Sequence, residues 1–340
     1  MAVIHFLNVL EGDCNIIQHN SGRLTVMDVS NAYNAEDTPE EKAAKMSKER
    51  EEKRKRTNVP SGKTNYRQKE TPDNPIEYLK NNIGAKNISR FIISHPDMDH
   101  IDGIKDLYTE FKPTNTWDTD NNKEISLNDN FAGYNKEDWK FYTELRAGRV
   151  KTTKRLTPYV SRLKNNLWSK DGLTILCPSK DLVKRANEKG DYNDASYVIL
   201  YTTSKKDGKS WKIIFAGDSD DHSWEHILKH HSKLVSNVDV LMAPHHGRDS
   251  GRNYNFLEVL KPRVTLMGNA SSRHLAYSCY RKIRITNNQA GFVVIDVTPE
   301  AMTFYVKHFD FARDFRHHRG WGIPVKNNKF NAYPLFKFDA

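Results

Sequence analysis

Two histidines and three aspartates crowd into a short stretch directly after an apolar run. Residues 92–103 read IISHPDMDHIDG, which brings His95, Asp97, Asp99 and His100 into one loop. Imidazole and carboxylate groups at this spacing can hold two divalent cations. A single His–Asp pair after a strand is usually a turn with a helix cap. Four such groups so close together favour a metal site, because crowded carboxylates repel one another unless cations neutralise them.

Two later apolar runs also end in groups suited to metal chemistry. Residues 212–218 read KIIFAGD, so a buried strand would end in Gly217 and Asp218. Residues 238–247 read VDVLMAPHHG, and a second strand would end in His245 and His246. Paired histidines there can supply a metal ligand and a neighbouring general acid or phosphate contact, or form only a polar turn. Because both segments follow the first loop in the chain and each ends in a possible ligand, we favour a role in metal chemistry over a polar turn.

The first loop resembles the signature HxHxDH of the metallo-β-lactamase superfamily, which is followed by a small residue, here Gly103. Asp97 stands where most members carry a second histidine. The resulting HxDxDH variant is similar to the hydrolase domain of bacterial DNA-uptake channel proteins (competence, ComEC-type), which also carry a PHHG segment. The resemblance implies a hydrolase with two divalent metal ions, Zn²⁺ or Mn²⁺, in which Asp218 bridges the two metals.

The resemblance also implies roles for individual residues. Asp99 would combine metal ligation with orientation of the attacking water, while His246 or His274 would donate a proton to the leaving oxygen. The loop that carries His95, Asp97, Asp99 and His100 is called the metal loop below. Asp28, at the end of an early strand, would orient the ligands of this loop without binding the metal itself. The full set of implied metal ligands is His95, Asp97, Asp99, His100, Asp218 and His245.

One expected ligand has no histidine to supply it. The superfamily usually takes a histidine between the first loop and the bridging aspartate, but no histidine lies between His100 and His222. The segment Asn193-Asp194-Ala195-Ser196 resembles an NDxS segment of the competence-type proteins. Asn193 or Asp194 would therefore fill or back the first metal position. Such an oxygen-rich position shifts the preference from zinc towards manganese.

The elements expected to position these groups are mostly strands. Residues 3–9, 15–19 and 23–29 predict a meander, and a helix over 76–82 leads into a strand at 90–94. A second sheet is predicted from residues 173–177, 197–202 and 212–216, with further strands at 264–267 and 292–297. The resemblance implies an α/β (α+β) metallo-β-lactamase αββα sandwich, with two central mixed sheets flanked by helices.

The domain organisation follows from composition. Residues 1–310 are expected to form the hydrolase domain, with a charged insertion at about 35–70 and a helical, basic insertion at about 112–171. Residues 311–340 are expected to form a basic, aromatic C-terminal extension, in which His317 and His318 are surface residues. The basic stretches in both insertions could contact phosphate, although charge runs are more often simply solvated.

Charge and cysteine content narrow the partners and the compartment. The chain carries 53 Lys and Arg against 43 Asp and Glu, a net charge of +10, which favours an anionic partner such as nucleic acid. Three isolated cysteines give no disulfide framework and fit a reducing, cytoplasmic compartment. The N-terminus lacks the basic region of a signal peptide, and no run reaches the roughly 20 apolar residues of a membrane span.

These observations predict a metal-dependent phosphodiesterase or nuclease that cleaves DNA or RNA with a water activated by two metals. The fold serves hydrolases of several substrate classes, so two alternatives stay open. One is a small-molecule hydrolase of cyclic nucleotides or phosphoesters. The other is a nucleic-acid-binding protein without catalysis.

Overall fold

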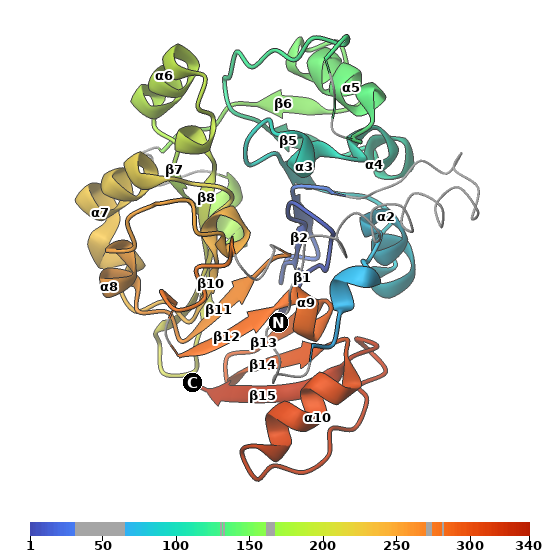
Figure 1. The fold of residues 1–340 in the computed structure, drawn as a ribbon, viewed down its shortest axis with the longest axis vertical. Coiled ribbons are helices and arrows are strands. Elements are labelled where there is room, and N and C mark those ends of the chain that lie inside the picture. Colours follow the sequence, from blue (N-terminus) through green and yellow to red (C-terminus); the bar gives the residue numbers. More distant parts are fainter. Residues whose placement is uncertain (31–64, 130, 132, 161–166, 270–273, 281) are drawn as a thin grey trace.

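The computed structural model describes residues 1–30, 65–129, 131, 133–160, 167–269, 274–280 and 282–340. Most of the charged insertion expected at about 35–70 lies outside these residues, as do Ser271, Ser272 and Arg273 beside His274. Within the described residues, the strands form two mixed sheets flanked by helices (Figure 1). This is the αββα sandwich expected from the sequence.

The larger sheet runs in the order β15-β14-β13-β1-β2-β3-β4-β5-β6. It pairs antiparallel from β15 to β3 and parallel from β3 to β6. Its strands are β1 (Ala2–Phe6), β2 (Asn15–Gln18), β3 (Leu24–Met27), β4 (Arg90–Ile92), β5 (Asn115–Trp117), β6 (Lys154–Leu156), β13 (Val293–Val297), β14 (Ala301–Val306) and β15 (Tyr333–Asp339).

The smaller sheet runs in the order β12-β11-β10-β9-β8-β7 and is parallel from β12 to β9. Its strands are β7 (Leu173–Cys177), β8 (Val198–Ser204), β9 (Ser210–Phe215), β10 (Val240–Met242), β11 (Val264–Met267) and β12 (Ile283–Thr286). The prediction that residues 173–177, 197–202 and 212–216 build a second sheet is confirmed, because β7, β8 and β9 are neighbours in it.

Helices cover the outer faces of both sheets (Figure 1). On the side of the smaller sheet lie α6 (Lys180–Lys189), α7 (Asp221–Val235) and α8 (Phe256–Leu260). On the side of the larger sheet lie α2 (Pro75–Tyr78), α4 (Ile104–Phe111) and α5 (Lys136–Arg146). The short α3 (Met98–Ile101) forms the last part of the metal loop and contains Asp99 and His100. α9 (Asn287–Ala290) and α10 (Phe309–His317) lie near the C-terminal strands.

The hydrophobic core lies between the two sheets and is extended by the outer helices. Along β9, Ile213 and Phe215 belong to the cluster between the sheets, whereas Ile214 packs with Trp224 and Ile227 of α7. Alternate residues of a strand point to opposite faces, so this strand is buried on both sides. That double burial explains why its sequence is a continuous apolar run ending abruptly at the polar site.

Residues 311–340 include the strand that forms one edge of the larger sheet. β15 pairs antiparallel with β14, so that Met302 lies opposite Phe338 and Phe304 opposite Phe336. Leu335 is fully buried in the core between the sheets. In the described part of the chain, no helix combines the length and apolarity that crossing a membrane requires.

We expect Leu335→Ala to lower the free energy of unfolding by about 2–5 kcal/mol, because it removes a fully buried side chain and leaves a cavity. Lys337→Ala, two residues along β15 and exposed, is the matched control and should change it by less than about 0.5 kcal/mol. Urea unfolding followed by fluorescence measures both. Equal effects would show that the C-terminal strand does not contribute to the core.

Candidate metal centre

The ends of four strands and one turn meet at the same edge of the two sheets. β3 is followed by Asp28, β4 by the loop from Ser94 to His100, and β9 by Asp218. β10 leads into His245 and His246, and the turn between β1 and β2 carries Asp13. β3 runs parallel to β4 and β9 runs parallel to β10, so each pair delivers its following residues at one end. The chain thereby gathers groups from distant parts of the sequence.

Glycine allows two of these segments to approach closely. Gly12 has φ +75°, and a Cβ there would lie 1.6 Å from the backbone oxygen of Asp99. Gly217 has φ +51°, and its Cβ would lie 3.0 Å from the Cβ of Ser94. Both positions need the left-handed backbone and the space that only glycine offers without strain. The turn after β1 and the end of β9 are therefore pressed against the metal loop.

Asp218 lies at the middle of the cluster. Its Oδ1 is 3.3 Å from Nε2 of His100, and its Oδ2 is 3.5 Å from Nε2 of His246. Nε2 of His245 and of His95 lie 3.6 and 3.9 Å from the same Oδ2. Asp99 lies beside this group, with its Oδ2 3.6 Å from Nε2 of His246. All these distances allow an ion to be shared among the side chains.

Buried polar atoms without hydrogen-bond partners point into this cluster. Among the described residues, the unpartnered atoms include Nε2 of His95, His100 and His246 and Oδ1 of Asp218. A buried polar atom left unpaired costs stability, so such atoms call for an explanation such as a bound ion. Three groups have ligand atoms within 4.8 Å of one another: His95–His100–Asp218, Asp99–His100–His246 and Asp13–Asp218–His246. The donor set of imidazole and carboxylate therefore fits a divalent metal.

Each inward histidine is held from behind through its other ring nitrogen. Nδ1 of His100 lies 2.9 Å from Oδ2 of Asp28, whose Oδ1 accepts from the backbone N–H of Ser94 at 2.7 Å. Nδ1 of His246 lies 3.1 Å from Oδ1 of Asp13, and Nδ1 of His95 lies 3.0 Å from the Ser94 hydroxyl. Such partners place the proton on Nδ1 and leave Nε2 free as a metal ligand.

The electrostatics show that the cluster needs positive charge. Burial lowers the pKa of His100, but the carboxylates of Asp218, Asp99 and Asp28 outweigh burial and raise it well above its usual value. Burial likewise opposes ionisation of Asp218, yet His246 and His100 hold the pKa of its carboxyl well below the usual range. Burial lowers the pKa of His95, which favours its neutral, metal-binding form. Asp218 and Asp13 likewise outweigh burial and raise the pKa of His246, so the surroundings of this cluster favour positive charge, which a divalent cation would supply.

The structure separates the sequence-predicted residues into interior and rim. His95, His100 and Asp218 are buried in the cluster, and Asp28 lies directly behind it. Three predicted ligands lie at the rim: the side chains of Asp97, Asp99 and His245 are 37%, 26% and 22% exposed. Among them only Asp99 belongs to one of the three groups above, whereas His246, predicted as a proton donor, belongs to two.

The remaining predicted residues lie further out. His274 is exposed, and its backbone oxygen accepts a hydrogen bond from the N–H of Asp249. Asp194 is buried, but its carboxylate lies 3.5 Å from Nε of Arg185 and belongs to none of the three groups. Asn193 is partly buried at the start of a short 3-10 helix over Asn193–Ala195. The backbone just after this segment touches the metal loop, because N–H of Tyr197 donates to the oxygen of Ser94.

Three further residues enter the site without having been singled out in the sequence. Asp13 contacts His246, which is far from it along the chain, and only its place in a Gly-Asp turn hinted at a role. Lys123 binds Asp97, with 2.5 Å between Nζ and Oδ1. Arg252 is buried, donates to the backbone oxygen of Ser219 at 2.6 Å, and places Nη2 3.3 Å from Nδ1 of His245. No local sequence pattern marks Lys123 or Arg252.

We expect Gly12→Ala to destabilise the protein more than Gly22→Ala and to weaken metal binding. Gly22 has a similar φ of +78°, but a Cβ added there would meet nothing within 4 Å, so its variant should cost only the left-handed backbone penalty of about 1–2 kcal/mol. Gly12→Ala adds the collision with Asp99 and must displace the metal loop. Urea unfolding and Mn²⁺ titration of both variants test this. Equal losses would contradict the close approach.

No family model and no curated protein matches the sequence. Similar solved structures include Igni18, a novel metallo hydrolase from the hyperthermophilic archaeon Ignicoccus hospitalis, with 13% identity, a TM-score of 0.44, and coverage of 87% of this chain and 100% of that chain. Another is a long form RNase Z from yeast, with 10% identity, a TM-score of 0.35, and coverage of 80% of this chain and 38% of that chain. At these TM-scores the likeness carries no argument about this protein, and the description of the fold depends on the sheet order and layers given above.

Proposed function

We propose that this protein is a metal-dependent hydrolase of phosphodiesters, with nucleic acid as its substrate. The observation that carries the proposal is the convergence of unpartnered buried atoms from His95, His100, His246 and Asp218. These atoms come from three separate segments, and each imidazole is oriented by a partner behind it. Such an arrangement is costly without a cation, and it is the kind of preparation that a catalytic metal site requires.

The interior residues and Asp99 would hold two ions. His95, His100 and Asp218 form one ligand group, and Asp99 and His246 would hold the second ion, because the one free nitrogen of His100 can ligate only a single ion. When bound, divalent ions there supply Lewis acidity that lowers the pKa of water and neutralises charge on phosphoryl oxygens. Imidazole and carboxylate ligands suit zinc and manganese alike.

The rim residues are suited to act on the substrate. The carboxylate of Asp99 is 26% exposed, so it can orient a water at the mouth of the site. The guanidinium of Arg252 has no acceptor, so Nδ1 of His245 must accept from it and the proton must reside on Nε2. That Nε2 lies 3.6 Å from Oδ2 of Asp218, and the partial exposure of the ring would let its N–H donate to a leaving oxygen. We therefore assign His246 as a ligand and His245 as the proton donor, the reverse of the roles expected from the sequence.

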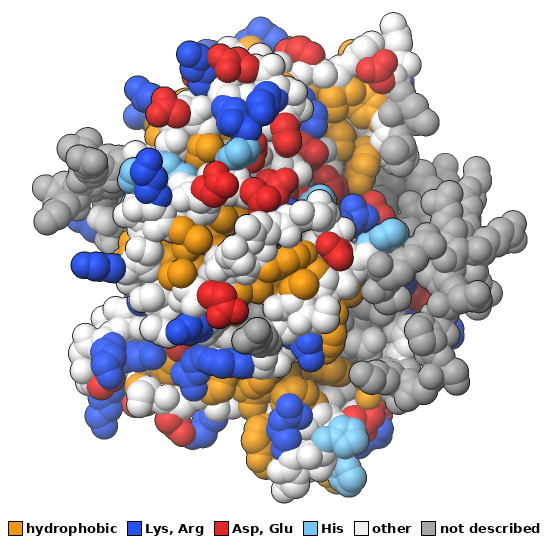
Figure 2. Space-filling model, turned by 60° about the vertical axis from the view of Figure 1, so that its left-hand side comes forward, with side chains coloured by type: hydrophobic (Ala, Val, Ile, Leu, Met, Phe, Trp, Pro, Cys, Tyr) orange, Lys and Arg blue, Asp and Glu red, His pale blue; other side chains and the backbone are white. Residues whose placement is uncertain are grey.

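The choice of a nucleic-acid substrate is supported by the HxDxDH loop and by the net charge of +10. The charge is not gathered into one basic surface on the face shown in Figure 2. There, Asp and Glu side chains gather in the upper middle of the face, with Lys and Arg side chains around them. On this face, contacts to phosphate would come from individual Lys and Arg side chains.

The test is degradation of a panel of single- and double-stranded DNA and RNA with Mn²⁺, Mg²⁺ or Zn²⁺ added. We expect cleavage that requires metal and is lost in Asp218→Ala, because that variant removes the carboxylate at the middle of the cluster. Asp207→Ala, in the exposed turn between β8 and β9, is the control and should cleave normally. Cleavage of small phosphoesters alone would favour the small-molecule hydrolase. Salt-sensitive binding without turnover would favour the non-catalytic nucleic-acid-binding protein.

We also expect Asp28→Asn to weaken metal binding by about 10–100-fold while the protein stays folded. The asparagine oxygen can still accept from Ser94, but its NH₂ group would donate to Nδ1 of His100. His100 would then carry its proton on Nε2 and lose its ligand lone pair. Competition with a chromogenic chelator measures the affinity, and Asp207→Asn is the matched control. Unchanged affinity would contradict the role of Asp28.

A further inference from the structure

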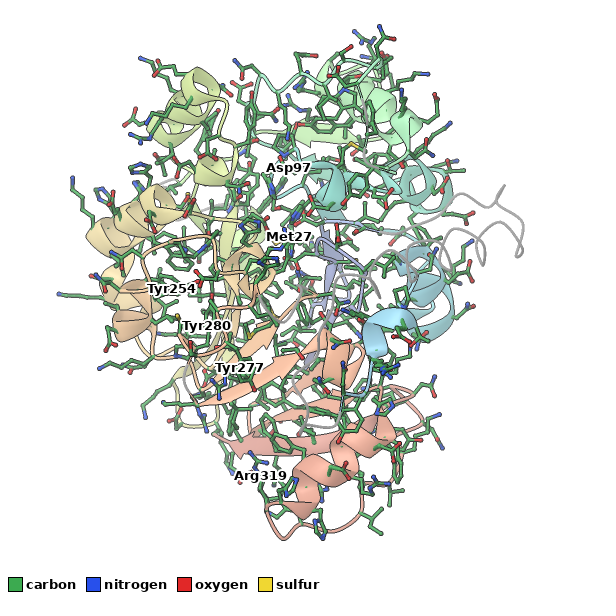
Figure 3. All side chains as sticks on the ribbon, in the orientation of Figure 1. Met27, Asp97, Tyr254, Tyr277, Tyr280 and Arg319 are labelled. Atoms are coloured by element: carbon green, nitrogen blue, oxygen red, sulfur yellow. The ribbon has the colours of Figure 1, made fainter. Side chains whose placement is uncertain are left out.

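The ammonium group of Lys123 lies between the metal loop and an aromatic ring. Its Nζ is 2.5 Å from Oδ1 of Asp97 and 5.5 Å from the ring centroid of Tyr192. Arg146 fixes the backbone of this segment by donating to the oxygen of Lys123 at 2.6 Å. Figure 3 shows Asp97 where the side of the smaller sheet and the side of the larger sheet come together. The pair is partly exposed, with 20% of the Lys123 side chain and 37% of the Asp97 side chain accessible.

Tyr192 is held beside the metal loop by its neighbours. Its hydroxyl donates to Oδ1 of Asn122 at 2.9 Å, and the ring is partly exposed. The segment that follows it is tied to the metal loop through the hydrogen bond from Tyr197 to Ser94. A positioned aromatic ring next to a lysine offers a surface for a base and a charge for a phosphate.

A hollow of about 520 Å³ adjoins Asn122 and repeats the same pairing. Tyr159 and Lys180 line it, and Nζ of Lys180 lies 5.8 Å from the centroid of the Tyr159 ring. Lys184, Asp120 and Glu188 also line the hollow, so its charge is mixed. Two tyrosine–lysine pairs thus adjoin Asn122, and the first of them contacts Asp97 of the metal loop through Lys123.

We infer that Lys123 and Tyr192 form a nucleotide subsite next to the metal centre, an inference that rests on the proposed function. Lys123 contacts the phosphate adjoining the cleaved bond, and Tyr192 stacks on an unpaired base. Oδ2 of Asp97 also lies 3.8 Å from Nε2 of His95, so an ion held by His95 would reach this carboxylate and compete with Lys123 for it. A cation that takes Asp97 frees the lysine charge for the substrate. The Tyr159–Lys180 pair receives the next nucleotide along the strand.

The base-stacking part is tested by binding of a fluorescein-labelled thymidine octamer, measured by fluorescence anisotropy without turnover. Tyr192→Ala should weaken binding roughly 5- to 150-fold, the range for loss of one stacked base, whereas Tyr192→Phe should keep most of the affinity. Tyr277→Ala is the matched control, because Tyr277 is 40% exposed, pairs with Arg284, and lies well away from Asp97 (Figure 3). Equal affinity of Tyr192→Ala and the unchanged protein would overturn the subsite.

The competition for Asp97 is tested by Mn²⁺ affinity, measured by calorimetry in the absence of substrate. Lys123→Met should bind Mn²⁺ several-fold more tightly and the octamer more weakly. Lys140→Met, which removes a lysine paired with Glu137 on α5, should change neither. Unchanged or weaker Mn²⁺ binding by Lys123→Met would overturn the shared role of Asp97.

Hydrolysis of bis(p-nitrophenyl) phosphate separates this inference from the proposed function. This minimal phosphodiester has no neighbouring nucleotide, so Tyr192→Ala should lose a smaller share of its kcat/KM on this probe than on the octamer, for which its KM rises. Octamer binding that depends on Tyr192 without hydrolysis of any phosphodiester would refute the hydrolase and keep the subsite. Hydrolysis with no dependence of octamer binding on Tyr192 would refute the subsite and keep the hydrolase.

Discussion

The buried carboxylate of Asp218 imposes the main constraint on this structure. A carboxylate removed from water is unstable unless positive groups or a bound cation compensate it. Here three imidazoles from two loops surround it, and each is held by an acid or a hydroxyl behind it. Those supporting groups are in turn fixed by strand ends and by the close backbone approach at Gly12. The sandwich of two sheets is what brings the segments together at one edge.

Interior and rim residues of the site differ in how firmly they are held. His95, His100 and His246 are buried and have oriented partners, so their donor atoms are positioned before any ion arrives. The side chains of Asp97, Asp99 and His245 are partly exposed, so solvent rather than packed protein surrounds part of each of them. The rim can therefore adjust to a substrate while the interior keeps its geometry.

The sequence was most informative at segments where a buried strand ends directly at residues of the site. The strands leading to the metal loop, to Asp218 and to the paired histidines could be predicted, because each is an apolar run that ends at polar groups. α4 (Ile104–Phe111) and α5 (Lys136–Arg146) are also predictable from the sequence, since their apolar residues follow a helical period. α6, α7 and α10 were not predicted, because charged residues and histidines dominate their exposed faces.

Contacts between distant segments could not be predicted from one sequence. The pairing of Asp13 with His246 depends on the packing of β1 against the rest of the sheet, and that of Lys123 with Asp97 depends on the path of a loop. The roles of His245 and His246 depend on backbone conformation. Both residues have positive φ, 52° and 57°, which turns one ring into the cluster and leaves the other at the rim. A local pattern of two histidines carries no information on that choice.

The position of β1 in the larger sheet also bears on how the chain is made. β1 pairs on one side with the nearby β2 and on the other with β13, so that Ala2 lies opposite Val297. During synthesis β1 leaves the ribosome long before β13, so one edge of β1 stays open until β13 has been made. Asp13 follows that strand, and His246 also comes late in the chain. Until β13 is made, the open edge of β1 is a place where another chain could pair, and the cluster that needs both Asp13 and His246 stays incomplete until His246 has been made.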